Sequence, residues 1–400
     1  MSVDSKVPEI RFKGFSGEWK NKKIGRILAE IKRPIELMDN ASYQLVTVKR
    51  RNEGVVPRVV LKGKNILVKN YFSVKAGDYL ISKRQVVHGA NGIVPDNLDG
   101  AVVSNEYLVV TDSDDITARY WTVISIRPEM HKLFFVSSYG VDIEKLVFDV
   151  TDWKNRTIVI PQVTEQKNIT DYFQKLDALI NQHQQKHDKL SSIKKAMLEK
   201  MFPKQGDSIP EIRFKGFSGE WKKLTLGDLG SVAMNKRIFK HQTTIIGEIP
   251  FFKIGTFGKQ ADAFISKTLF DEYKAKYPYP VAGDLLLSAS GSIGRVVEYK
   301  GEEQYFQDSN IVWLKHDGKI DNAFLKVFYS MVKWSGLEGS TIQRLYNKNI
   351  LDTEISTPER HEQTAIGNYF QKLDALINQH QQQITKLNNI KQACLCKMFV

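Results

Sequence analysis

A fourteen-residue string occurs twice in this chain without a change, and it constrains the fold more than any other feature. The string YFQKLDALINQHQQ is found at residues 172–185 and again at residues 369–382. A second string, PEIRFKGFSGEWK, is repeated in the same way at residues 8–20 and 210–222. Each half therefore has a fixed opening segment, a variable middle and a fixed end, which indicates an internal duplication.

The fixed ends carry the periodicity of long helices. Apolar positions alternate spacings of three and four, which is the heptad pattern of a coiled coil. Each segment begins after a proline, Pro161 or Pro358, and a helix of more than thirty residues is a rod of roughly 50 Å. The seam residues are Phe173, Leu176, Ile180 and Leu190 in the first copy and Phe370, Leu373, Ile377 and Leu387 in the second. Leu179, Ile193 and Leu198 are expected to widen the first stripe.

Such a stripe needs a partner, and the other copy is the economical one. We expect the two seams to meet antiparallel about a pseudo-two-fold axis, as in an isologous contact. The alternative is that each helix packs only against its own domain.

The variable middles, residues 21–160 and 223–357, are typical of mixed α/β domains. Strands are expected at residues 59–61, 79–82 and 107–110 in the first middle, and at 285–288 and 311–314 in the second. The segment AGDYLIS at 76–82 parallels AGDLLLS at 282–288. We also match GANGIV at 89–94 with GSIGRV at 291–296, and Ser104-Asn105 with Ser309-Asn310. Both middles are thus expected to share one fold.

Size and charge narrow the class of protein. A chain of 400 residues suits two domains of ordinary size. No apolar run approaches the roughly 20 residues of a membrane span, and the N-terminus has no apolar signal core, so we expect a cytoplasmic protein. The net charge of +13 and the pI near 9.3 favour a polyanionic partner such as nucleic acid.

Catalytic motifs are not evident in the sequence. The segments GANG and GSIG match neither the dinucleotide fingerprint nor a P-loop. They are interpreted as tight turns between strands, or alternatively as glycine loops that approach a DNA backbone. Glu272-Tyr273-Lys274 lacks the upstream Pro-Asp of a nuclease motif. We therefore expect no catalytic residues in this chain.

A metal site is not expected either. His183 and His187 lie one helical turn apart, a spacing that can chelate a metal. However, the second copy has Ile384 where the first has His187, which favours packing histidines. The cysteines, Cys394 and Cys396, have no further ligands nearby in sequence and are interpreted as structural.

The opening segments mix aromatic, glycine and cationic residues. Stacking of Phe15 or Trp19 on bases is conceivable. The preferred interpretation is structural: the aromatic side chains anchor a turn that leads the chain from helix to domain. A segment that is identical in both halves cannot distinguish two DNA sequences.

Polar side chains able to contact base edges gather in the variable middles. Arg and Lys suit guanine, Asn and Gln suit adenine, and other cations can bind phosphates. For each residue the alternative is ordinary solvated surface. The candidates are Lys83, Arg84, Gln85, His88, Asn91, Asn105 and Tyr107 in the first middle, and Lys236, Arg237, Ser288, Ser290, Ser292, Arg295, Gln307, Asn310, Gln343, Arg344 and Lys348 in the second.

These features together resemble the specificity subunit of type I restriction-modification systems. The resemblance is carried by the repeated opening segments, GSIG at 291–294, GSTIQRLYNKNI at 339–350, IPQVTEQKNITDYFQKLDALI at 160–180 and TPERHEQTAIGNYFQKLDALI at 357–377. It extends over essentially the whole chain. The ordered repeat of two middles and two helices is more specific than any single string.

The resemblance implies a non-catalytic subunit that reads DNA. It divides the chain into target recognition domain 1 (residues 1–160), a first spacer helix (161–203), a short linker and target recognition domain 2 (204–357), and a second spacer helix (358–400). Each recognition domain would read one half of a bipartite target in double-stranded DNA, and the helices would set the spacer and dock two methyltransferase subunits.

The resemblance also implies which chemistry lies elsewhere. No cofactor is expected on this chain: S-adenosylmethionine, ATP and Mg²⁺ would act in the methyltransferase and restriction subunits.

The middles differ in length, because the opening segments are offset by 202 residues and the helical strings by 197. Two other functions remain open at this point: a self-contained DNA-cutting or DNA-modifying enzyme, and a coiled-coil scaffold that does not bind DNA.

Overall fold

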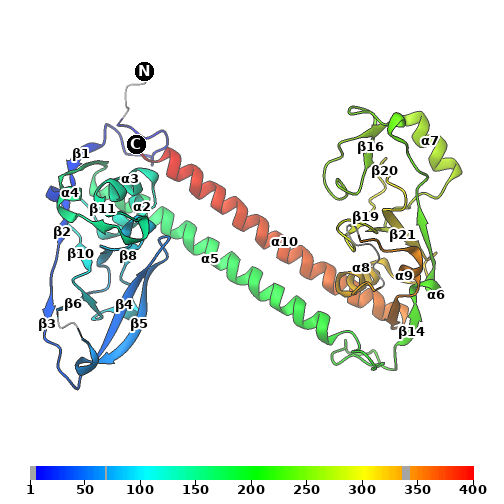
Figure 1. Ribbon diagram of the computed structural model, residues 1–400, viewed down its shortest axis with the longest axis horizontal. Coiled ribbons are helices and arrows are strands. Elements are labelled where there is room, and N and C mark those ends of the chain that lie inside the picture. The colour runs from blue at the N-terminus through cyan, green and yellow to red at the C-terminus, as the bar shows by residue number, and fades with distance from the viewer. Residues whose placement is uncertain (1–5, 68–69, 336–342) are drawn as a thin grey trace. The chain divides into compact units, whose positions relative to one another are not determined.

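The computed structural model describes residues 6–67, 70–335 and 343–400. The chain divides into two compact units. Unit 1 comprises Met1–His183 together with Gln382–Val400, and unit 2 comprises Gln184–Gln381. Each of the two long helices contributes residues to both units (Figure 1).

Unit 1 is a mixed α/β domain built on two sheets. Its four-stranded sheet has the order β2-β10-β7-β8, and its five-stranded sheet has the order β3-β6-β9-β4-β5. Two-stranded pairs, β1-β13 and β11-β12, complete it. The strands are β1 (Lys20–Lys23), β2 (Ala29–Glu30), β3 (Pro34–Ile35), β4 (Ser42–Lys49), β5 (Gly54–Lys62), β6 (Tyr71–Ser73), β7 (Tyr79–Ser82), β8 (Asn91–Ile93), β9 (Val102–Ser104), β10 (Tyr107–Thr111), β11 (Ser138–Tyr139), β12 (Val147–Phe148) and β13 (Thr157–Ile160).

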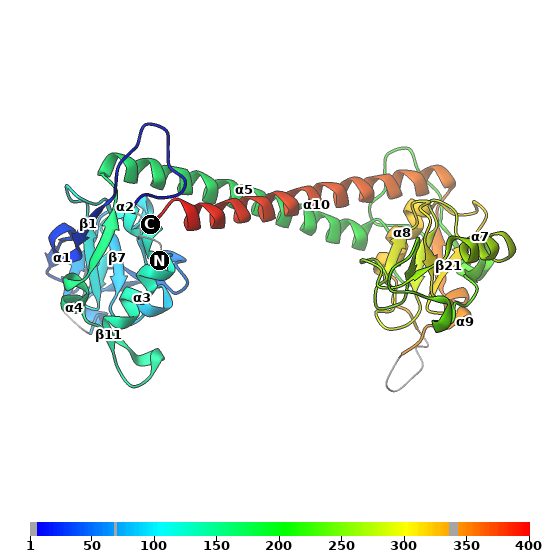
Figure 2. The same ribbon diagram turned by 90° about the horizontal axis from the view of Figure 1, so that it is seen from above.

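Short helices cover the four-stranded sheet of unit 1. They are α1 (Ile24–Ile27), α2 (Ala118–Ser125), α3 (Pro128–Val136) and α4 (Val150–Asn155), with 3₁₀ turns η1 (Gly63–Asn65), η2 (Val86–His88), η3 (Asp96–Leu98) and η4 (Ile143–Lys145). Helix α2 starts where the Thr117 side chain accepts a hydrogen bond from the Tyr120 amide, which satisfies a donor left free at the helix start. The segment that follows β11 projects from the body of this unit (Figure 2).

Unit 2 contains a four-stranded sheet of the same design, with the order β15-β21-β18-β19. Its second sheet is smaller, with three strands in the order β17-β16-β20, and β14 pairs with β22. The strands are β14 (Lys222–Thr225), β15 (Ser231–Met234), β16 (Ile249–Phe252), β17 (Phe264–Ile265), β18 (Leu285–Ser288), β19 (Val296–Glu298), β20 (Tyr305–Phe306), β21 (Ile311–Lys315) and β22 (Glu354–Thr357). The helices are α6 (Leu226–Leu229), α7 (Lys267–Lys276), α8 (Asn322–Met331) and α9 (Asn347–Leu351), with η5 at Lys240–Gln242.

The two predicted long helices are present. Helix α5 (Val163–Lys200) and helix α10 (Arg360–Lys397) each have 38 residues. Both are therefore longer than thirty residues, as expected. The strands expected at 79–82 and 285–288 are β7 and β18, and those expected at 59–61, 107–110 and 311–314 lie within β5, β10 and β21. The mixed α/β prediction for both middles is confirmed.

The seam is partly buried in each unit. Phe173, Leu176, Phe370 and Leu373 are at most 6% exposed, whereas Ile180, Leu190, Ile377 and Leu387 are half-buried. Ion pairs join the helices beside the seam: Lys391 to Asp177 at 2.6 Å in unit 1, and Lys194 to Asp374 at 2.5 Å in unit 2. The expectation that Leu179 widens the stripe is wrong, because Leu179 is 44% exposed. Ile193 and Leu198 do widen it, since both are partly buried and pack against the core of unit 2.

The opening segments are structural, as predicted. In unit 1, Trp19 is 2% exposed and packs edge-on against Phe399, which follows α10. In unit 2, Trp221 packs edge-on against Phe202, which follows α5. The buried tryptophans belong to the main core of each unit and cannot stack on bases.

A buried ion pair ties each opening segment to the start of a long helix. The Arg11 guanidinium donates two hydrogen bonds to Glu165, at 2.6 and 2.7 Å, and Arg213 donates two to Glu362, both at 2.6 Å. Both glutamates are 1% exposed. The hydrogen bonds with Glu165 raise the pKa of Arg11 above its ordinary value. Bidentate geometry of this kind fixes orientation as well as distance.

The same opening segment also contacts the end of a long helix. The Ile10 amide donates to the Lys397 carbonyl at 2.9 Å, and the Ile212 amide donates to the Lys200 carbonyl at 2.8 Å. Lys397 pairs with Glu9, and Lys200 pairs with Glu211. In each unit, the opening segment therefore holds together the start of one long helix and the end of the other.

Candidate nucleic-acid interface

One end of the four-stranded sheet gathers most of the candidate residues in each unit. In unit 1, Ser82 at the end of β7 pairs with Tyr107 at the start of β10, and the loop from β7 to β8 leaves from the same end. In unit 2, Ser288 at the end of β18 pairs with Ile311 at the start of β21. Loops 83–90 and 289–295 thus occupy equivalent places, which we call the reading edge of each unit.

The strand pairing corrects two of the correspondences drawn from the sequence. Because Tyr107 and Ile311 occupy the same place, Asn105 and Asn310 are offset by one residue. The carbonyl that accepts from Gly77 is that of Val94, whereas the carbonyl that accepts from Gly283 is that of Tyr299. GANGIV therefore does not align with GSIGRV. The loops differ in length between the two halves. The register of the strands is determined by long-range pairing, which cannot be read from the sequence.

Cations at the reading edge of unit 1 are held by neighbours on the same edge. The Lys83 ammonium donates to the Asn105 carbonyl at 2.6 Å, and burial lowers the pKa of Lys83 from its ordinary value. The Arg84 guanidinium donates to Glu106 at 2.7 Å, and this hydrogen bond raises its pKa. Arg84 and Asn105 are exposed, and Tyr107 is half-buried. These side chains are within reach of a ligand that approaches this edge.

Other candidates in unit 1 have structural roles. Asn91 is 2% exposed and donates to the Asn52 side chain at 3.2 Å. His88 is half-buried, and its Nε2 lies 3.3 Å from the Ile143 carbonyl oxygen. The Gln85 side-chain oxygen is buried and has no hydrogen-bond partner among the described residues. Asn91 in particular is positioned to support the edge rather than to contact a base.

In unit 2, hydrogen bonds within the edge use several of the candidate side chains. Ser288 and Ser290 are buried: the Ser288 hydroxyl donates to the Ser292 carbonyl, and the Ser290 hydroxyl donates to Asn310 at 2.7 Å. The Gln307 side chain accepts from the Ile254 amide at 2.9 Å. Buried polar groups are normally paired in this way, so these side chains shape the loop.

Exposed candidates surround this closed loop of unit 2. The Arg295 guanidinium donates to the Phe257 carbonyl at 2.9 Å, and Arg237 pairs with Asp308 at 2.8 Å. The Lys236 ammonium lies 5.1 Å from the centre of the Tyr277 ring. Ser292, Gln343, Arg344 and Lys348 are also exposed, and Ser290 forms a β-bridge with Arg344. The part of GSTIQRLYNKNI at 339–342 lies outside the described residues, as do residues 1–5 of the N-terminus.

The glycines at the reading edges are used for close packing. Gly89 has a φ of +74°, and a Cβ there would lie 3.1 Å from atoms of Asn52. In unit 2, Gly294 has a φ of +85°, and a Cβ would lie 3.0 Å from the Trp334 indole nitrogen. These contacts agree with the interpretation of the glycines as turn residues.

Sequence reasoning missed the turn from β4 to β5, which reaches the reading edge of unit 1. The Arg51 amide donates to the His88 carbonyl at 2.7 Å, and the Asn52 amide donates to the Gly89 carbonyl at 2.8 Å. The neighbouring Arg50 pairs with Glu144 at 2.6 Å. The available signal was the run Arg50-Arg51-Asn52-Glu53-Gly54 between two β-type segments, which is typical of a cationic hairpin turn.

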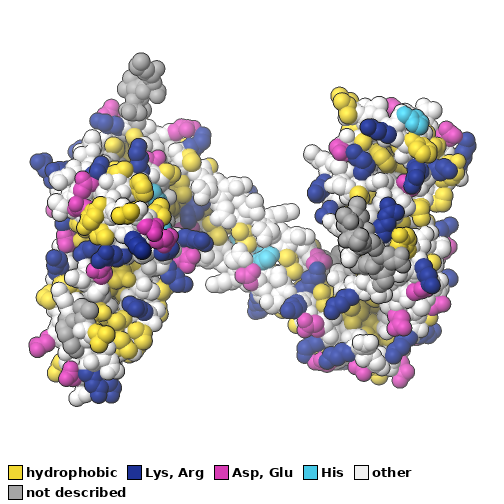
Figure 3. Space-filling model, in the orientation of Figure 1, with side chains coloured by type: hydrophobic (Ala, Val, Ile, Leu, Met, Phe, Trp, Pro, Cys, Tyr) yellow, Lys and Arg dark blue, Asp and Glu magenta, His cyan; other side chains and the backbone are white. Residues whose placement is uncertain are grey.

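The geometry gives little support for a metal site. Among the described residues no cluster of three or more His, Cys, Asp or Glu side chains is arranged to hold a metal ion. His187 lies 3.0 Å from Asp188, and Cys394 lies 3.5 Å from the Tyr172 hydroxyl. Within the same residues, no helix has both the length and the apolar character to cross a membrane. On the face seen in Figure 3, Lys and Arg are interspersed with Asp and Glu rather than gathered in one patch.

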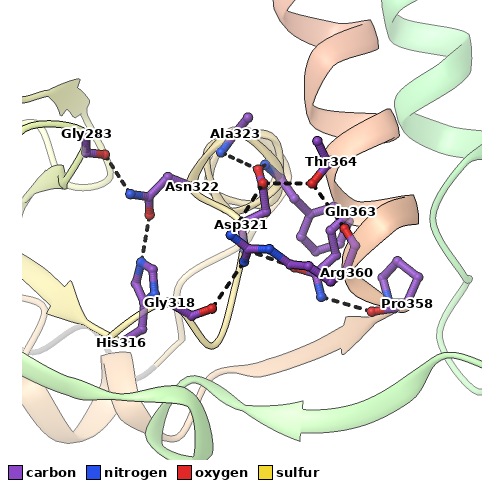
Figure 4. A network of polar contacts seen from close by, with 11 residues as sticks. Gly283, His316, Gly318, Asp321, Asn322, Ala323, Pro358, Arg360, Gln363 and Thr364 are labelled. Atoms are coloured by element: carbon purple, nitrogen blue, oxygen red, sulfur yellow. Dashed lines mark hydrogen bonds and ion pairs between the residues drawn. The ribbon is translucent and has the colours of Figure 1, made fainter.

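A buried glutamine joins each unit to the start of a long helix. In unit 2, Gln363 accepts from the Asp321 amide and donates to the Pro358 carbonyl, both at 2.9 Å (Figure 4). Asp321 also caps helix α8 and accepts from Thr364 at 3.0 Å. In unit 1, Gln166 accepts from the Thr117 amide at 3.1 Å and donates to the Pro161 carbonyl at 2.9 Å. These contacts fix the domain relative to the start of the helix that carries it.

Comparison with known proteins finds a family match in the second half of the chain. Residues 218–389 match the family described as the type I restriction modification DNA specificity domain. This part of the chain is therefore similar to a type I DNA specificity domain. This domain spans the globular part of unit 2 and most of helix α10.

A curated relative and two solved structures are also similar to this chain. A Haemophilus influenzae protein described as a type I restriction enzyme specificity subunit is 54% identical over 158 residues, which cover 39% of this chain and 41% of that protein. The match thus spans less than half of the relative. The S subunit of a type I restriction-modification system from M. genitalium has a TM-score of 0.62 with 12% identity and covers 98% of this chain and 99% of its own. An HsdS subunit from Thermoanaerobacter tengcongensis has a TM-score of 0.44 with 16% identity over 95% of this chain and 96% of its own.

Proposed function

We propose that this chain is the DNA-reading specificity subunit of a type I restriction-modification complex and has no catalytic activity of its own. The observation that carries the proposal is the match of residues 218–389 to a specificity domain, in a chain whose two units have the same four-stranded sheet but different loops at its edge. Each unit reads one half of a bipartite target in double-stranded DNA. Exposed cations bind phosphates, and edge side chains contact bases.

The long helices form an antiparallel coiled coil with pseudo-two-fold symmetry, and they set the spacer between the half-sites. Matching contacts in the two units support this part of the proposal, because each opening segment holds the start of one helix and the end of the other. Two methyltransferase subunits dock on the helices, and restriction subunits join them. The four-part division at residues 160, 203 and 357 stays a prediction.

The partners supply the chemistry. S-adenosylmethionine serves the methyltransferase subunits, and ATP with Mg²⁺ serves the restriction subunits. The complex acts in the cytoplasm. The buried and paired side chains of the reading edges suit recognition, because binding specificity depends on donors and acceptors held in place.

The decisive experiment measures DNA methylation by the partner methyltransferase subunits with and without this chain. Methylated motifs are mapped by sequencing genomic DNA from cells that express either combination. A bipartite motif that appears only with the chain supports the proposal, and methylation that is independent of the chain contradicts it. Incubation of the purified chain with DNA and Mg²⁺ tests the alternative of a self-contained nuclease, for which cleavage would be the sign.

Exchange of one middle tests the division of reading between the units. Replacement of residues 223–357 by another middle should change one half-site and leave the other half-site and the spacer unchanged. The matched control replaces residues 21–160 and should change the opposite half-site. A change in both half-sites after either exchange would contradict modular reading.

Insertion into the helices tests the spacer. A heptad inserted after Lys195 in α5, together with one after Asp374 in α10, keeps the seam in register and lengthens each helix by about 10 Å. Since Lys194 and Asp374 pair, the two insertions fall at the same level. The spacer should lengthen by about three base pairs at roughly 3.4 Å each, and an unchanged spacer would contradict the proposal.

A further inference from the structure

The β4–β5 turn holds an arginine in a conformation that arginine rarely adopts. Arg51 has a φ of +59° and Asn52 has a φ of +57°. Asparagine tolerates this left-handed region, whereas a long side chain with an ordinary Cβ is disfavoured there. The strands on either side are in register at Lys49 and Gly54. A glycine at position 51 would relieve the strain, so the presence of arginine needs a reason.

Contacts from two sides keep the turn in place. The Arg51 and Asn52 amides donate to the carbonyls of His88 and Gly89 at 2.7 and 2.8 Å. The Asn52 side chain accepts from the buried Asn91 and lies against Gly89, whose missing Cβ makes room for it. On the other side, Arg50 pairs with Glu144 of η4 at 2.6 Å. The backbone at residue 51 is therefore fixed by groups outside its own hairpin.

The Arg51 side chain is left exposed by this arrangement. Its backbone makes the fixing contacts, while its guanidinium forms no ion pair or hydrogen bond within the described residues. It lies beside the loop that carries Lys83, Arg84 and His88, the candidates at the reading edge of unit 1. The neighbouring cations behave differently, because Arg50 pairs with Glu144 and Arg84 pairs with Glu106.

A strained residue also lies at the reading edge of unit 2. Ser309 has a φ of +52° and precedes Asn310, whose side chain accepts from Ser290. Strained backbone that the surrounding contacts maintain is concentrated at functional sites. Both reading edges thus hold a non-glycine residue in the left-handed region, although they are built from different loops.

We propose that Arg51 is a specificity-determining residue that contacts a guanine base edge in the half-site read by unit 1. This inference rests on the proposed function. A guanidinium fork matches the two acceptors that guanine presents in the major groove, and it does so only when its position is fixed. A contact to phosphate, in contrast, needs no strained turn, because any exposed cation can make it.

The test uses the full chain assembled with its methyltransferase subunits, and it measures binding to cognate and non-cognate DNA together with the methylated motif. In the Arg51→Gly variant, affinity for cognate DNA should fall about tenfold or more, while affinity for non-cognate DNA changes about twofold. The motif should lose its preference at one position of one half-site. Thermal stability should stay the same or rise, because glycine suits the left-handed conformation.

Two further variants make the result decisive. Arg51→Lys keeps the charge without the fork and should lose specific binding much as Arg51→Gly does. Arg58→Ala removes an exposed cation from β5 of the same hairpin and should lower both affinities equally. An equal loss on cognate and non-cognate DNA for Arg51→Gly would assign Arg51 to phosphate and overturn the inference, as would no loss at all. If the unaltered chain directs no methylation, the proposed function fails instead.

Discussion

The two units share the contacts that join the opening segment and the domain to the long helices. They differ in the globular parts that these contacts hold. In both, an arginine of the opening segment pairs with a buried glutamate, a glutamine bonds to the carbonyl of a proline, and a tryptophan packs on a phenylalanine that follows a long helix. Their second sheets differ: five strands in unit 1 and three in unit 2. The residue types are the same in both units where the contacts require one geometry. The parts of the domains attached to these contacts differ.

The reading edges extend this comparison to chemistry. Unit 1 presents cations that are paired with carboxylates, such as Arg84 with Glu106 and Arg50 with Glu144. Unit 2 builds its edge from hydroxyl and amide groups, such as Ser288, Ser290 and Asn310. The same sheet end thus supports two hydrogen-bonding surfaces. A residue at one edge therefore does not predict the role of the residue in the same place at the other.

The largest effect is expected from breaking the buried ion pair. Arg213→Ala leaves Glu362 buried without its partner, and Arg11→Ala does the same to Glu165. Removal of one partner of a buried pair typically lowers the free energy of unfolding by about 3–5 kcal/mol. Because the geometry is the same in both units, the two variants should lose similar amounts, as measured by urea denaturation.

Controls for this prediction separate buried from exposed pairs. Lys276→Ala removes an exposed pair with Glu272 within helix α7 and should leave the urea midpoint unchanged. If Arg213→Ala lowers the free energy of unfolding no more than Lys276→Ala does, the opening segment does not stabilise unit 2. A large loss in one unit only would show that the shared contacts are not equivalent.

The glutamine contacts should give a smaller and again matched effect. Gln363→Ala removes the acceptor of the Asp321 amide and the donor to the Pro358 carbonyl. Each buried group left unsatisfied costs about 1–3 kcal/mol. Gln166→Ala should behave alike in unit 1. The comparison variant Gln371→Ala changes an exposed glutamine of the same helix α10 and should have little effect on the free energy of unfolding.

The sequence predicted the repeated frame well because its signals are local. Heptad spacing identified α5 and α10, and the Ala-Gly-Asp segments located β7 and β18. The partners of the opening segments were not predicted as contacts, since Arg11 and Glu165 are 154 residues apart. The only sequence signal for their structural role was that the opening segment is identical in the two halves.

The reading edges could be predicted only in part. The candidate residues do gather at one sheet end, but their exposure depends on loops distant in sequence. Ser288 and Asn91 are buried by such loops, and Arg51 was overlooked because the turn from β4 docks on residues 88 and 89. The register error in matching GANGIV with GSIGRV has the same origin, since strand pairing is a long-range property.

Outcomes of different size are expected from alanine substitutions at one place on the long helices where the two units differ. Gly367 of α10 lies against α8, and a Cβ there would meet the Ala323 Cβ at 2.6 Å and the Phe324 nitrogen at 2.8 Å. The matching residue of α5 is Thr170. Gly367→Ala should lower the free energy of unfolding by about 1–3 kcal/mol through overpacking, although alanine favours helices. Thr170→Ala removes a buried methyl group and should cost only about 1 kcal/mol, because its hydroxyl, within the described residues, bonds to the Gln166 carbonyl of its own helix. A stabilising Gly367→Ala would mean that α8 and α10 are not in close contact.

The smallest effect concerns the response of unit 1 to acid. Burial lowers the pKa of His131 in helix α3 below its ordinary value. A depressed histidine pKa means that the unfolded chain binds the proton more readily, so stability is full above about pH 6.5 and falls as the pH drops below it. Urea midpoints measured at pH 7.5 and pH 5.5 should therefore differ less in His131→Gln than in the unaltered chain. Equal differences would show that His131 does not contribute, and that the acid response of unit 1 comes from its carboxylates instead.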